Sequence, residues 1–237
     1  MITTIRDNIR FTEIGQDRKV SIGKIIDRMQ DCSNYQSELL GLGMDNQLKT
    51  KKAWILSSWN IRINRRPDHG REVLTSTWPT SFSKCFGRRN YTIAYSEEPD
   101  NNIVEAEAVW VLYDIENQMP TRISEKEMEK FECDKALNLG CPGRKIKKAL
   151  EYEKKDGWKV EKYHLDINNH MNNAWYIKLS AELLENEDDV KNVRIEYKKS
   201  AVLGDYIYPY VCYDKNRCVV ELRSDKDEVF SIAEFHY

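Results

Sequence analysis

The stretch from His164 to Leu184 reads HLDINNHMNNAWYIKLSAELL, and the spacing of its apolar residues changes at His170. Up to His170, apolar and polar residues alternate, which predicts an extended backbone with Asp166, Asn168 and His170 on one face. Beyond it, apolar residues recur at spacings of three and four, as on one side of a helix: Met171, Ala174, Ile177, Ala181 and Leu184. The stretch therefore predicts a strand that leads into an amphipathic helix, with Asn169 to Asn173 at the helix start.

Residues of these types at a helix start can carry hydrolytic chemistry. The first turn of a helix has N–H groups without intrahelical partners and a partial positive charge, so the backbone of Met171, Asn172 and Asn173 could hold an oxyanion. The side chains of Asp166, Asn168 and His170 supply a base, an amide that orients a carbonyl group and an electrostatic stabiliser. Hydrolysis of an activated acyl group requires these functions. A single residue of this kind more often caps a helix or lies on the surface, but three on one face favour a site.

The composition is that of a globular protein. Of the 237 residues, 41% are hydrophobic and 32% are charged, and no apolar run approaches the roughly 20 residues that a membrane span requires. The segment Met1 to Arg10 carries charges and lacks the apolar core of a secretory signal, so we expect a cytoplasmic protein. The formal net charge of −2 gives no argument for binding nucleic acid or an anionic membrane.

The cysteines indicate neither a metal centre nor a disulfide framework. No C-x-x-C pair or closely spaced pair of histidines is present, so the sequence predicts no metal site and no cofactor. In a chain of this length without a signal peptide, cysteines are more often reduced and buried than cross-linked. The chain has six of them: Cys32, Cys85, Cys133, Cys141, Cys212 and Cys218.

The periodicity along the chain predicts two similar halves. In the first, a strand over Phe11 to Ile22 leads into a helix that runs to about Leu40 and ends at Gly41 and Gly43. Four strand-like segments follow, Ala53 to Ile63, Glu72 to Thr80, Lys84 to Ser96 and Ile103 to Asp114. The second half repeats this plan with a strand over Val160 to Asn168, the helix from Met171, and strands near Val193 to Ser200, Asp205 to Tyr213, Cys218 to Ser224 and Val229 to His236. Each half is thus an α+β unit in which a sheet covers one helix.

Between the two halves, Glu116 to Gly157 is charged and rich in turn residues, with Gly140, Pro142 and Gly143 as breakers. A segment of this length is longer than an ordinary loop, so we expect it to contain helical turns. The predicted division of the chain is residues 1–130, a connector over 131–156, and residues 157–237.

The string DINNHMNNAWY resembles the D-x-N-x-H-x-N-N-x-x-Y motif of the acyl-acyl-carrier-protein thioesterases of plants and bacteria. Other short segments occur in the order of that family: Gln30-Asp31-Cys32-Ser33, Thr77-Trp78, Arg88-Arg89, Tyr197-x-Lys199 and Gly204-Asp205. The resemblance implies a tandem (double) hotdog fold, in which each of two curved antiparallel sheets wraps a long helix. It also implies hydrolysis of fatty acyl-acyl-carrier-protein thioesters in fatty acid biosynthesis, with an acyl-chain pocket in the first half and the catalytic motif in the second.

The same resemblance implies roles for single residues. His170 would act as the base or its polariser, Asn168 would orient the thioester, and Asp166 would hold the arrangement. One position departs from the family, because many members have a Glu where this chain has Ser200. A carboxylate that could act as a base is therefore missing there, and Glu196, further back on the same strand, is a doubtful replacement.

The acyl chain and the carrier protein have candidate contacts too. The apolar side chains of Ile25, Ile26 and Met29 could line the acyl tunnel, although plain core packing explains them equally well. An acidic acyl carrier protein could dock on basic residues. Three basic clusters are available: Arg62, Arg65 and Arg66; Arg88 and Arg89; and Arg144, Lys145, Lys147 and Lys148.

Three alternatives stay open from the sequence. An acyl-coenzyme A thioesterase or a hotdog dehydratase would use a similar tunnel, and a hotdog protein could also bind acyl thioesters without hydrolysing them. A monomer and a homodimer are both compatible with the sequence.

Overall fold

The computed structural model describes residues 1–140 and 143–237. Within them, twelve strands form one antiparallel sheet in the order β1-β3-β4-β5-β2-β9-β12-β11-β10-β7, with β6 paired to β5 and β8 paired to β10. The strands are β1 (Thr3–Asn8), β2 (Lys52–Ile63), β3 (Glu72–Ser83), β4 (Phe86–Tyr95), β5 (Asn102–Asp114), β6 (Met119–Pro120), β7 (Glu153–Lys154), β8 (Trp158–Lys159), β9 (Asn192–Tyr197), β10 (Tyr206–Asp214), β11 (Arg217–Arg223) and β12 (Val229–His236). The helices are α1 (Ile22–Leu39), α2 (Met44–Thr50), α3 (Glu125–Met128) and α4 (Asn173–Ala181), and the 3₁₀ turns are η1 (Phe11–Glu13), η2 (Lys162–His164) and η3 (Glu187–Asp189).

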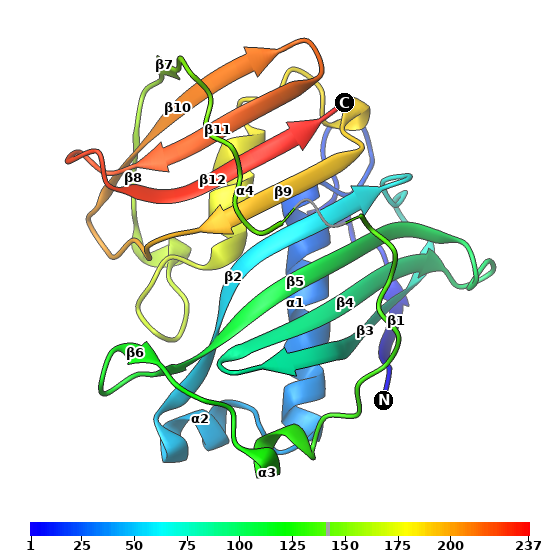
Figure 1. The fold of residues 1–237 in the computed structure, drawn as a ribbon. Coiled ribbons are helices and arrows are strands. Elements are labelled where there is room, and N and C mark those ends of the chain that lie inside the picture. The colour runs from blue at the N-terminus through cyan, green and yellow to red at the C-terminus, as the bar shows by residue number, and fades with distance from the viewer. Residues whose placement is uncertain (141–142) are drawn as a thin grey trace.

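The two halves of the chain have the same topology. In the first, β3, β4 and β5 form a meander, β2 pairs with β5, and β1 pairs with β3. In the second, β10, β11 and β12 form the meander, β9 pairs with β12, and β8 pairs with β10. The halves join where β2 pairs with β9, from Ser58 opposite Glu196 to Arg62 opposite Asn192. Figure 1 shows the continuous sheet with α1 and α4 behind it. This is the tandem hotdog architecture that the sequence predicts.

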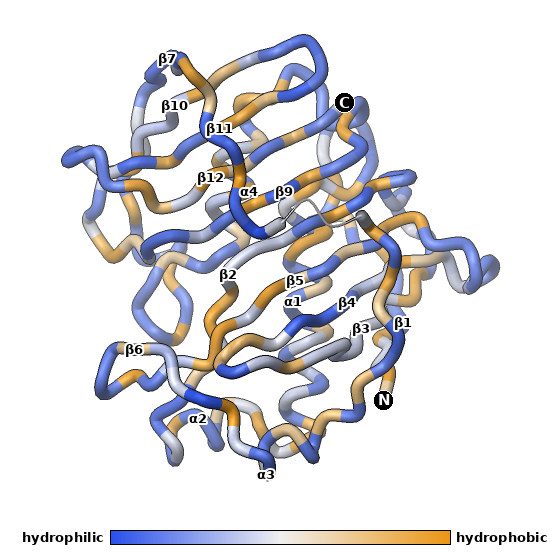
Figure 2. The backbone as a smooth tube through the Cα atoms, in the orientation of Figure 1, coloured by the Kyte–Doolittle hydropathy of each residue, from blue (hydrophilic) through white to orange (hydrophobic). Residues whose placement is uncertain are grey.

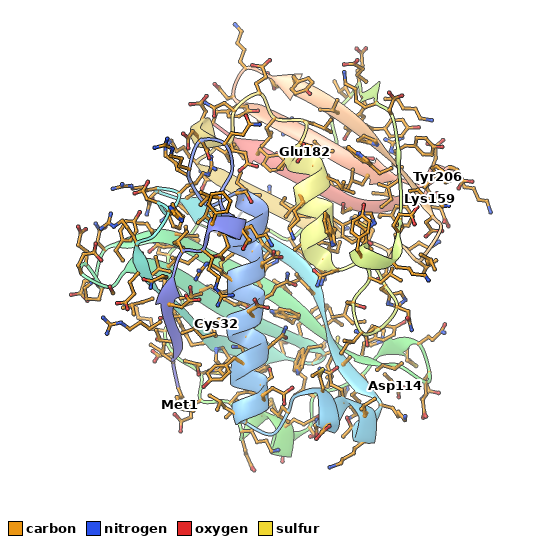
Figure 3. The ribbon with its side chains drawn as sticks, turned by 180° about the vertical axis from the view of Figure 1, so that it is seen from behind. Met1, Cys32, Asp114, Lys159, Glu182 and Tyr206 are labelled. Atoms are coloured by element: carbon orange, nitrogen blue, oxygen red, sulfur yellow. The ribbon has the colours of Figure 1, made fainter. Side chains whose placement is uncertain are left out.

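Helix α1 is positioned by its sequence at both ends. The side chain of Ser21 caps its start, and Gly41 follows its end in the left-handed conformation, with φ of 65°. Its sheet-facing side is apolar and fully buried at Ile25, Ile26 and Met29. Helix α4 packs beside the first turns of α1, where Lys178 binds Asp27 at 2.9 Å. Figure 3, seen from behind, shows the shorter α4 next to the upper part of α1.

The connector crosses the outer face of the sheet, opposite the helices. Figure 1 shows it running in front of the strands from α3 to β7, and Figure 2 shows that most of it is hydrophilic. Ile146 packs on Val219 and Ile232, and its N–H donates to the buried Glu196 at 3.3 Å. Arg194 donates to the carbonyl groups of Gly143 and Lys145. Glu196 and Arg194 of β9 are therefore paired with the connector on this outer face.

The structure corrects several boundaries. The strand predicted over Phe11 to Ile22 is instead η1 followed by a tight turn. The first strand is β1, which lies in the charged segment Met1 to Arg10, where no strand was predicted. The strand predicted over Val160 to Asn168 is also wrong, because β8, η2 and a second tight turn occupy it. In each case the alternation comes from a hairpin turn closed by a single bridge.

The connector and the second helix differ in extent from the predictions. Among the described residues from Glu116 to Gly157, helix occurs only in the four residues of α3. Helix α4 is shorter than predicted: Met171 precedes it and Leu184 follows it, although Ala174, Ile177 and Ala181 are buried as the periodicity predicts. Pro142, read as a breaker, lies outside the described residues.

The core explains the sequence pattern. A single apolar cluster runs through both halves between the helices and the sheet, and a small second cluster lies under the connector. In Figure 2 the turns at the outer ends of the sheet are hydrophilic. Across the described ranges, no helix is long and apolar enough to cross a membrane.

Candidate functional site

The candidate site is a tight hairpin from Leu165 to Met171 that leads into α4. The N–H of Asp166 donates to the carbonyl oxygen of His170 at 2.7 Å, and Asn169 adopts φ of 59° at the turn. Asp166 Oδ1 accepts the N–H groups of Asn168 at 2.8 Å and of His170 at 3.2 Å. The carboxylate therefore fixes the turn through the backbone. Asp166, Asn168 and His170 do lie close together, but on a turn and not on one face of a strand.

The half-buried Asp166 and the exposed side chains of Asn168 and His170 are open to a substrate. An exposed imidazole without a packing role can be changed at little cost to the fold. The role of His170 can therefore be tested apart from stability.

A second segment, from Ser200 to Asp205, supports this hairpin. The N–H of Met171 donates to the carbonyl oxygen of Ala201 at 2.9 Å, and His170 forms a bridge with Val202. The N–H of Ala201 in turn donates to the hydroxyl of the buried Tyr176 on α4 at 2.8 Å. Ser200 is the exposed residue directly before this support.

Glu196 lies on the wrong side of the sheet to replace the missing carboxylate. Its neighbours Val193 and Ile195 face the core, whereas Glu196 accepts the N–H of Ile146 on the outer face. Four residues along the strand, Ser200 has already left β9. The structure thus excludes Glu196 as a group that acts at the hairpin.

The oxyanion prediction for the start of α4 needs correction. The N–H of Met171 donates to the carbonyl oxygen of Ala201, and the N–H of Asn172 donates to the carbonyl oxygen of His164, each at 2.9 Å. The side chain of Asn172 caps the helix by accepting the N–H of Ala174 at 2.9 Å. Of the three predicted amides, only the Asn173 N–H has no acceptor in the described structure. A developing oxyanion could therefore use one of these amides, not three.

A cleft of about 370 Å³ lies between the exposed face of α1 and the segment around η1, and the residue before α4 reaches its edge. Asn172 lines it from α4, and Gln30, Asp31 and Asn34 line it from α1. The pKa of Asp31 is raised, first because the cleft desolvates its carboxylate and second because Asp27 is nearby. Gln30 and Asp31, which belong to one of the segments in the family's order, thus line the cleft beside the candidate site.

A smaller cavity of about 60 Å³ lies further along α1, inside the first half. Aromatic side chains from three strands and the connector line much of it: Trp54, Phe82, Trp110 and Phe131. Asn34 lines both this cavity and the cleft. Ile25, Ile26 and Met29 are fully buried in the core and line neither space. Their place along an acyl tunnel stays a prediction.

One histidine of the region was not singled out from the sequence. His164 is buried, its Nδ1 accepts the N–H of Glu161 at 2.8 Å, and its ring packs edge-on against Trp175. Burial lowers the pKa of His164, which keeps the ring neutral and able to accept that hydrogen bond. Its role is to hold the entry to the hairpin. His164 stands at the start of the alternating stretch, and the sequence pattern alone does not distinguish its structural role from the role predicted for His170.

The described cysteines are free thiols, and Cys141 lies outside the described residues. Burial raises the pKa of Cys32 to about 11 and that of Cys218 to about 12. Cys133 is exposed, which departs from the prediction that the cysteines are buried. Among the described residues, no group of three or more acidic, histidine and cysteine side chains could hold a metal ion.

The basic clusters differ in exposure. Arg66 and Arg89 are buried, so neither is available to a partner on the surface. Arg62 and Arg88 extend to carboxylates on β5, Glu105 and Glu107. Arg144 lies over the ring of Phe86, on the connector side of the sheet.

Comparison with known families and structures bears on both halves. The family model described as "Acyl-ACP thioesterase N-terminal domain" matches residues 3–131, and the one described as "Acyl-ACP thioesterase C-terminal domain" matches residues 147–235. The chloroplastic acyl-[acyl-carrier-protein] hydrolase FATB2 of Cuphea viscosissima is 26% identical over 209 residues. That match covers 81% of this chain and 50% of the relative, so the chain spans about half the length of this relative. The chloroplastic oleoyl-acyl carrier protein thioesterase of Coriandrum sativum is 21% identical over 219 residues, covering 84% of this chain and 59% of that protein.

Solved structures share the whole fold. The crystal structure of an acyl-ACP thioesterase from Bacteroides thetaiotaomicron superposes with a TM-score of 0.88 at 18% identity, covering 99% of this chain and 97% of that one. The 12:0-ACP thioesterase from Umbellularia californica superposes with a TM-score of 0.85 at 15% identity, covering 99% and 96%. At these identities the likeness establishes a common fold across both halves.

Proposed function

Because the chain belongs to the acyl-ACP thioesterase family, we propose that it hydrolyses fatty acyl thioesters of acyl carrier protein to free fatty acid and carrier protein. One observation carries the proposal: the motif residues Asp166, Asn168 and His170 meet on one preorganised turn at the start of α4. That turn leads to the edge of the cleft on α1. The relatives whose names state this activity support the substrate class.

The proposed reaction needs a water molecule, a base and a place for negative charge. Water adds to the thioester carbonyl carbon as His170 takes up a proton from it. The carbon–sulfur bond then breaks, and the proton returns to the leaving thiolate of the carrier protein. Asn168 would orient the carbonyl group, and the free N–H of Asn173 could donate to the carbonyl oxygen as charge develops there. Asp166 holds the backbone of Asn168 and His170 in the turn through its two hydrogen bonds.

We further propose that the acyl chain leaves the cleft along α1 and enters the smaller cavity of the first half, the inner cavity. Asn34 lines both spaces, which supports this path. We also propose that the chain divides into residues 1–130, a connector over 131–156, and residues 157–237. The two family models leave residues 132–146 unmatched, which supports a connector there. Docking of the acidic carrier protein on a basic patch is likewise a proposal, and neither Arg66 nor Arg89 can belong to that patch.

A panel of thioesters tests the function. The purified chain is given acyl carrier proteins loaded with saturated chains of graded length, the matching acyl-coenzyme A esters, and an enoyl carrier protein. Mass spectrometry then follows free acid and hydrated product. We expect free acid from the carrier-protein esters at a higher kcat/KM than from the coenzyme A esters. Faster hydrolysis of coenzyme A esters, or hydration of the enoyl ester, would identify one of the rival enzymes. Tight binding without turnover would identify an acyl-thioester sensor.

A further inference from the structure

Large apolar side chains gather on the surface around the candidate hairpin. Tyr163 on η2 and Ile167 in the hairpin turn are each 70% exposed. Val202 forms the bridge with His170, so the exposed Val202 and the exposed Leu203 after it lie next to the hairpin. Exposed apolar side chains that lie together mark a surface that a partner covers. We call this surface the apolar rim, and its members are Tyr163, Ile167, Val202, Leu203 and Tyr206.

Backbone contacts hold the segments of the apolar rim together. The N–H of Val160, shortly before η2, donates to the carbonyl oxygen of Asp205 at 2.8 Å. Tyr206 pairs with Lys159 across β10 and β8, and Figure 3 shows these two residues close together on the second half. The segment that leads into η2 is thus fixed beside the segment that supports the hairpin. The rim is therefore built by neighbouring parts of one half.

The first half contains the same backbone arrangement, and it therefore serves as an internal control for the rim. It has its own 3₁₀ turn, its own hairpin and its own supporting segment after β2. The matching features are the bridges Lys19–Asp68 and His170–Val202, the 2.9 Å backbone hydrogen bonds from Val20 to Pro67 and from Met171 to Ala201, and the left-handed Gly70 and Gly204. These contacts align the two halves residue by residue.

The aligned positions are apolar only in the half that carries the motif. The reverse exchange occurs at Phe11, which corresponds to Lys162 and packs edge-on against His69. Because the first half keeps the same backbone with polar side chains, the fold does not require the apolar ones. Their exposure instead indicates binding. The rim residues and their counterparts are Tyr163 and Thr12, Ile167 and Gln16, Val202 and Asp68, Leu203 and His69, and Tyr206 and Glu72.

Two lysines beside the rim favour an acidic partner. Lys159 and Lys162 are both exposed, with Glu161 between them. Basic residues singled out from the sequence lie elsewhere, because Arg62 donates to a carbonyl group of the connector and Arg144 belongs to the connector itself. The connector crosses the face of the sheet opposite the helices, whereas the hairpin leads into α4. Of these basic residues, the two lysines are the ones that adjoin the hairpin.

We propose that the apolar rim, with Lys159 and Lys162 beside it, is the surface on which the acyl carrier protein docks. This proposal rests on the proposed thioesterase function and specifies where its partner binds. The carrier protein brings the thioester to the hairpin, so it must bind where the hairpin is exposed. A second copy of this chain on the rim would cover His170 and close the site. The rim thus fits an acidic partner that binds through apolar contacts and leaves again.

The first half supplies the substitutions for the test. Ile167→Gln and Leu203→His replace two rim residues by their counterparts, which the same backbone accommodates. Each should raise the Kd for holo acyl carrier protein, measured by titration calorimetry, by about tenfold, as for an important contact of an interface. Leu48→Gln is the matched control. Leu48 is 68% exposed and lies on α2, which Figure 1 shows at the far end of the first half.

Kinetics show whether this binding serves hydrolysis. The value of kcat/KM is measured for one acyl chain carried either by the carrier protein or by N-acetylcysteamine, which has no protein to dock. The ratio of the two values should fall by about tenfold in Ile167→Gln and in Leu203→His, and it should not change in Leu48→Gln. Thermal melting confirms that each variant is folded. An unchanged ratio in both rim variants overturns the proposal.

The binding measurement separates this proposal from the proposed activity. Weaker binding of holo carrier protein to the rim variants would support docking even if no thioester were hydrolysed, in which case only the proposed function would fail. Unchanged binding to both variants would overturn docking even in an active thioesterase. Sedimentation tests the other occupant, and we expect the same oligomeric state in the parent and in Ile167→Gln. A parent dimer that dissociates in Ile167→Gln would assign the rim to a second copy and overturn the proposal.

Discussion

Two hairpin turns of the same geometry precede the two main helices, and their side chains have different partners. The turn before α1 is closed by a bridge between Ile14 and Val20, as Leu165 to Met171 is before α4. Each follows a 3₁₀ turn, η1 or η2, and each leads to a capped helix start. The first turn is thus the counterpart of the candidate site in the other half.

The backbone of the two turns agrees residue by residue. In the first, the Gly15 N–H donates to the Lys19 carbonyl oxygen at 2.9 Å, as Asp166 does to His170 in the second at 2.7 Å. The left-handed residue is Arg18 in the first, with φ of 63°, and Asn169 in the second. The fold itself therefore prescribes the turn, and the side chains decide its use.

The side chains of the two turns differ in their partners. Lys19, which corresponds to His170, binds Asp188 at 2.8 Å, and Asp17, which corresponds to Asn168, binds the buried Arg66 at 2.6 Å. Lys19 thus ties the first turn to η3 of the second half directly, and Asp17 does so through Arg66, which also pairs with Asp188. The motif turn makes no comparable ion pair within the described residues. One turn thus stabilises the contact between the halves, and the other is left free to meet a substrate.

The sharpest test of this comparison exchanges matched residues of the two turns for alanine. His170→Ala should lower kcat on acyl carrier protein by about 10²-fold or more, because a positioned base contributes about 10²–10⁴-fold. Its melting temperature should stay near that of the parent, since the imidazole is exposed. Lys19→Ala is the matched control and should leave kcat unchanged while it lowers stability by about 0–1 kcal/mol, as for a partly exposed ion pair.

Steady-state kinetics and thermal melting on both variants decide the matter. If Lys19→Ala reduced kcat as strongly as His170→Ala, the two turns would not differ in function, and the assignment of the base would be wrong.

The second test makes the motif turn resemble its counterpart at one position. Asp166→Gly places the glycine of the first turn where the carboxylate now accepts two N–H groups. The turn should lose about 1–3 kcal/mol of local stabilisation. Poorer placement of His170 should then cost about 10- to 100-fold in kcat. Comparison of Asp166→Gly in the parent and in the His170→Ala background shows whether the two residues act together. Full additivity of the two losses would contradict a positioning role.

Much of the fold was predictable, because it follows from the local spacing of apolar residues. The end of α1 follows from the apolar spacing and Gly41, and the meander strands follow from β-branched and aromatic runs. The turn from Leu165 to Met171 was not predictable in this way. Alternation over seven residues looks alike in a strand and in a hairpin, and the contact that distinguishes them pairs Met171 with Ala201, thirty residues away.

The candidate site was predictable in its residues but not in its geometry. The motif order identified Asp166, Asn168 and His170, yet only the structure shows that Asp166 acts through backbone N–H groups.

The third test concerns the half that lacks the motif. In Gly87→Ala the new methyl group would lie 3.0 Å from Phe82 Cε1 and 3.2 Å from Trp54 Cη2, at the wall of the inner cavity. The preferred acyl chain should become shorter, with a change of several-fold between neighbouring lengths and little change in kcat for the shortest substrates. Rates on carrier proteins with graded chains measure this shift. An unchanged profile would mean that the chain does not reach this cavity.

The core residue Met29 provides a companion to that test. If Met29 lines the acyl tunnel as predicted, Met29→Ala should move the optimum toward longer chains. Its loss of stability should be about 2–5 kcal/mol in either case, because the side chain is fully buried. A lower melting temperature with an unchanged optimum would show that Met29 belongs to the core alone.

The smallest effect is expected at Ser200, beside the motif turn. Its side chain is exposed and neutral, so Ser200→Ala should lower kcat by less than about tenfold and leave the melting temperature unchanged. Ser200→Glu introduces a carboxylate at the residue before the segment that supports His170, where it could orient water. If Ser200→Ala abolished turnover in a folded protein while His170→Ala kept most of it, the chemistry would have to be centred on the serine hydroxyl, and the motif turn would be a second structural turn like the first.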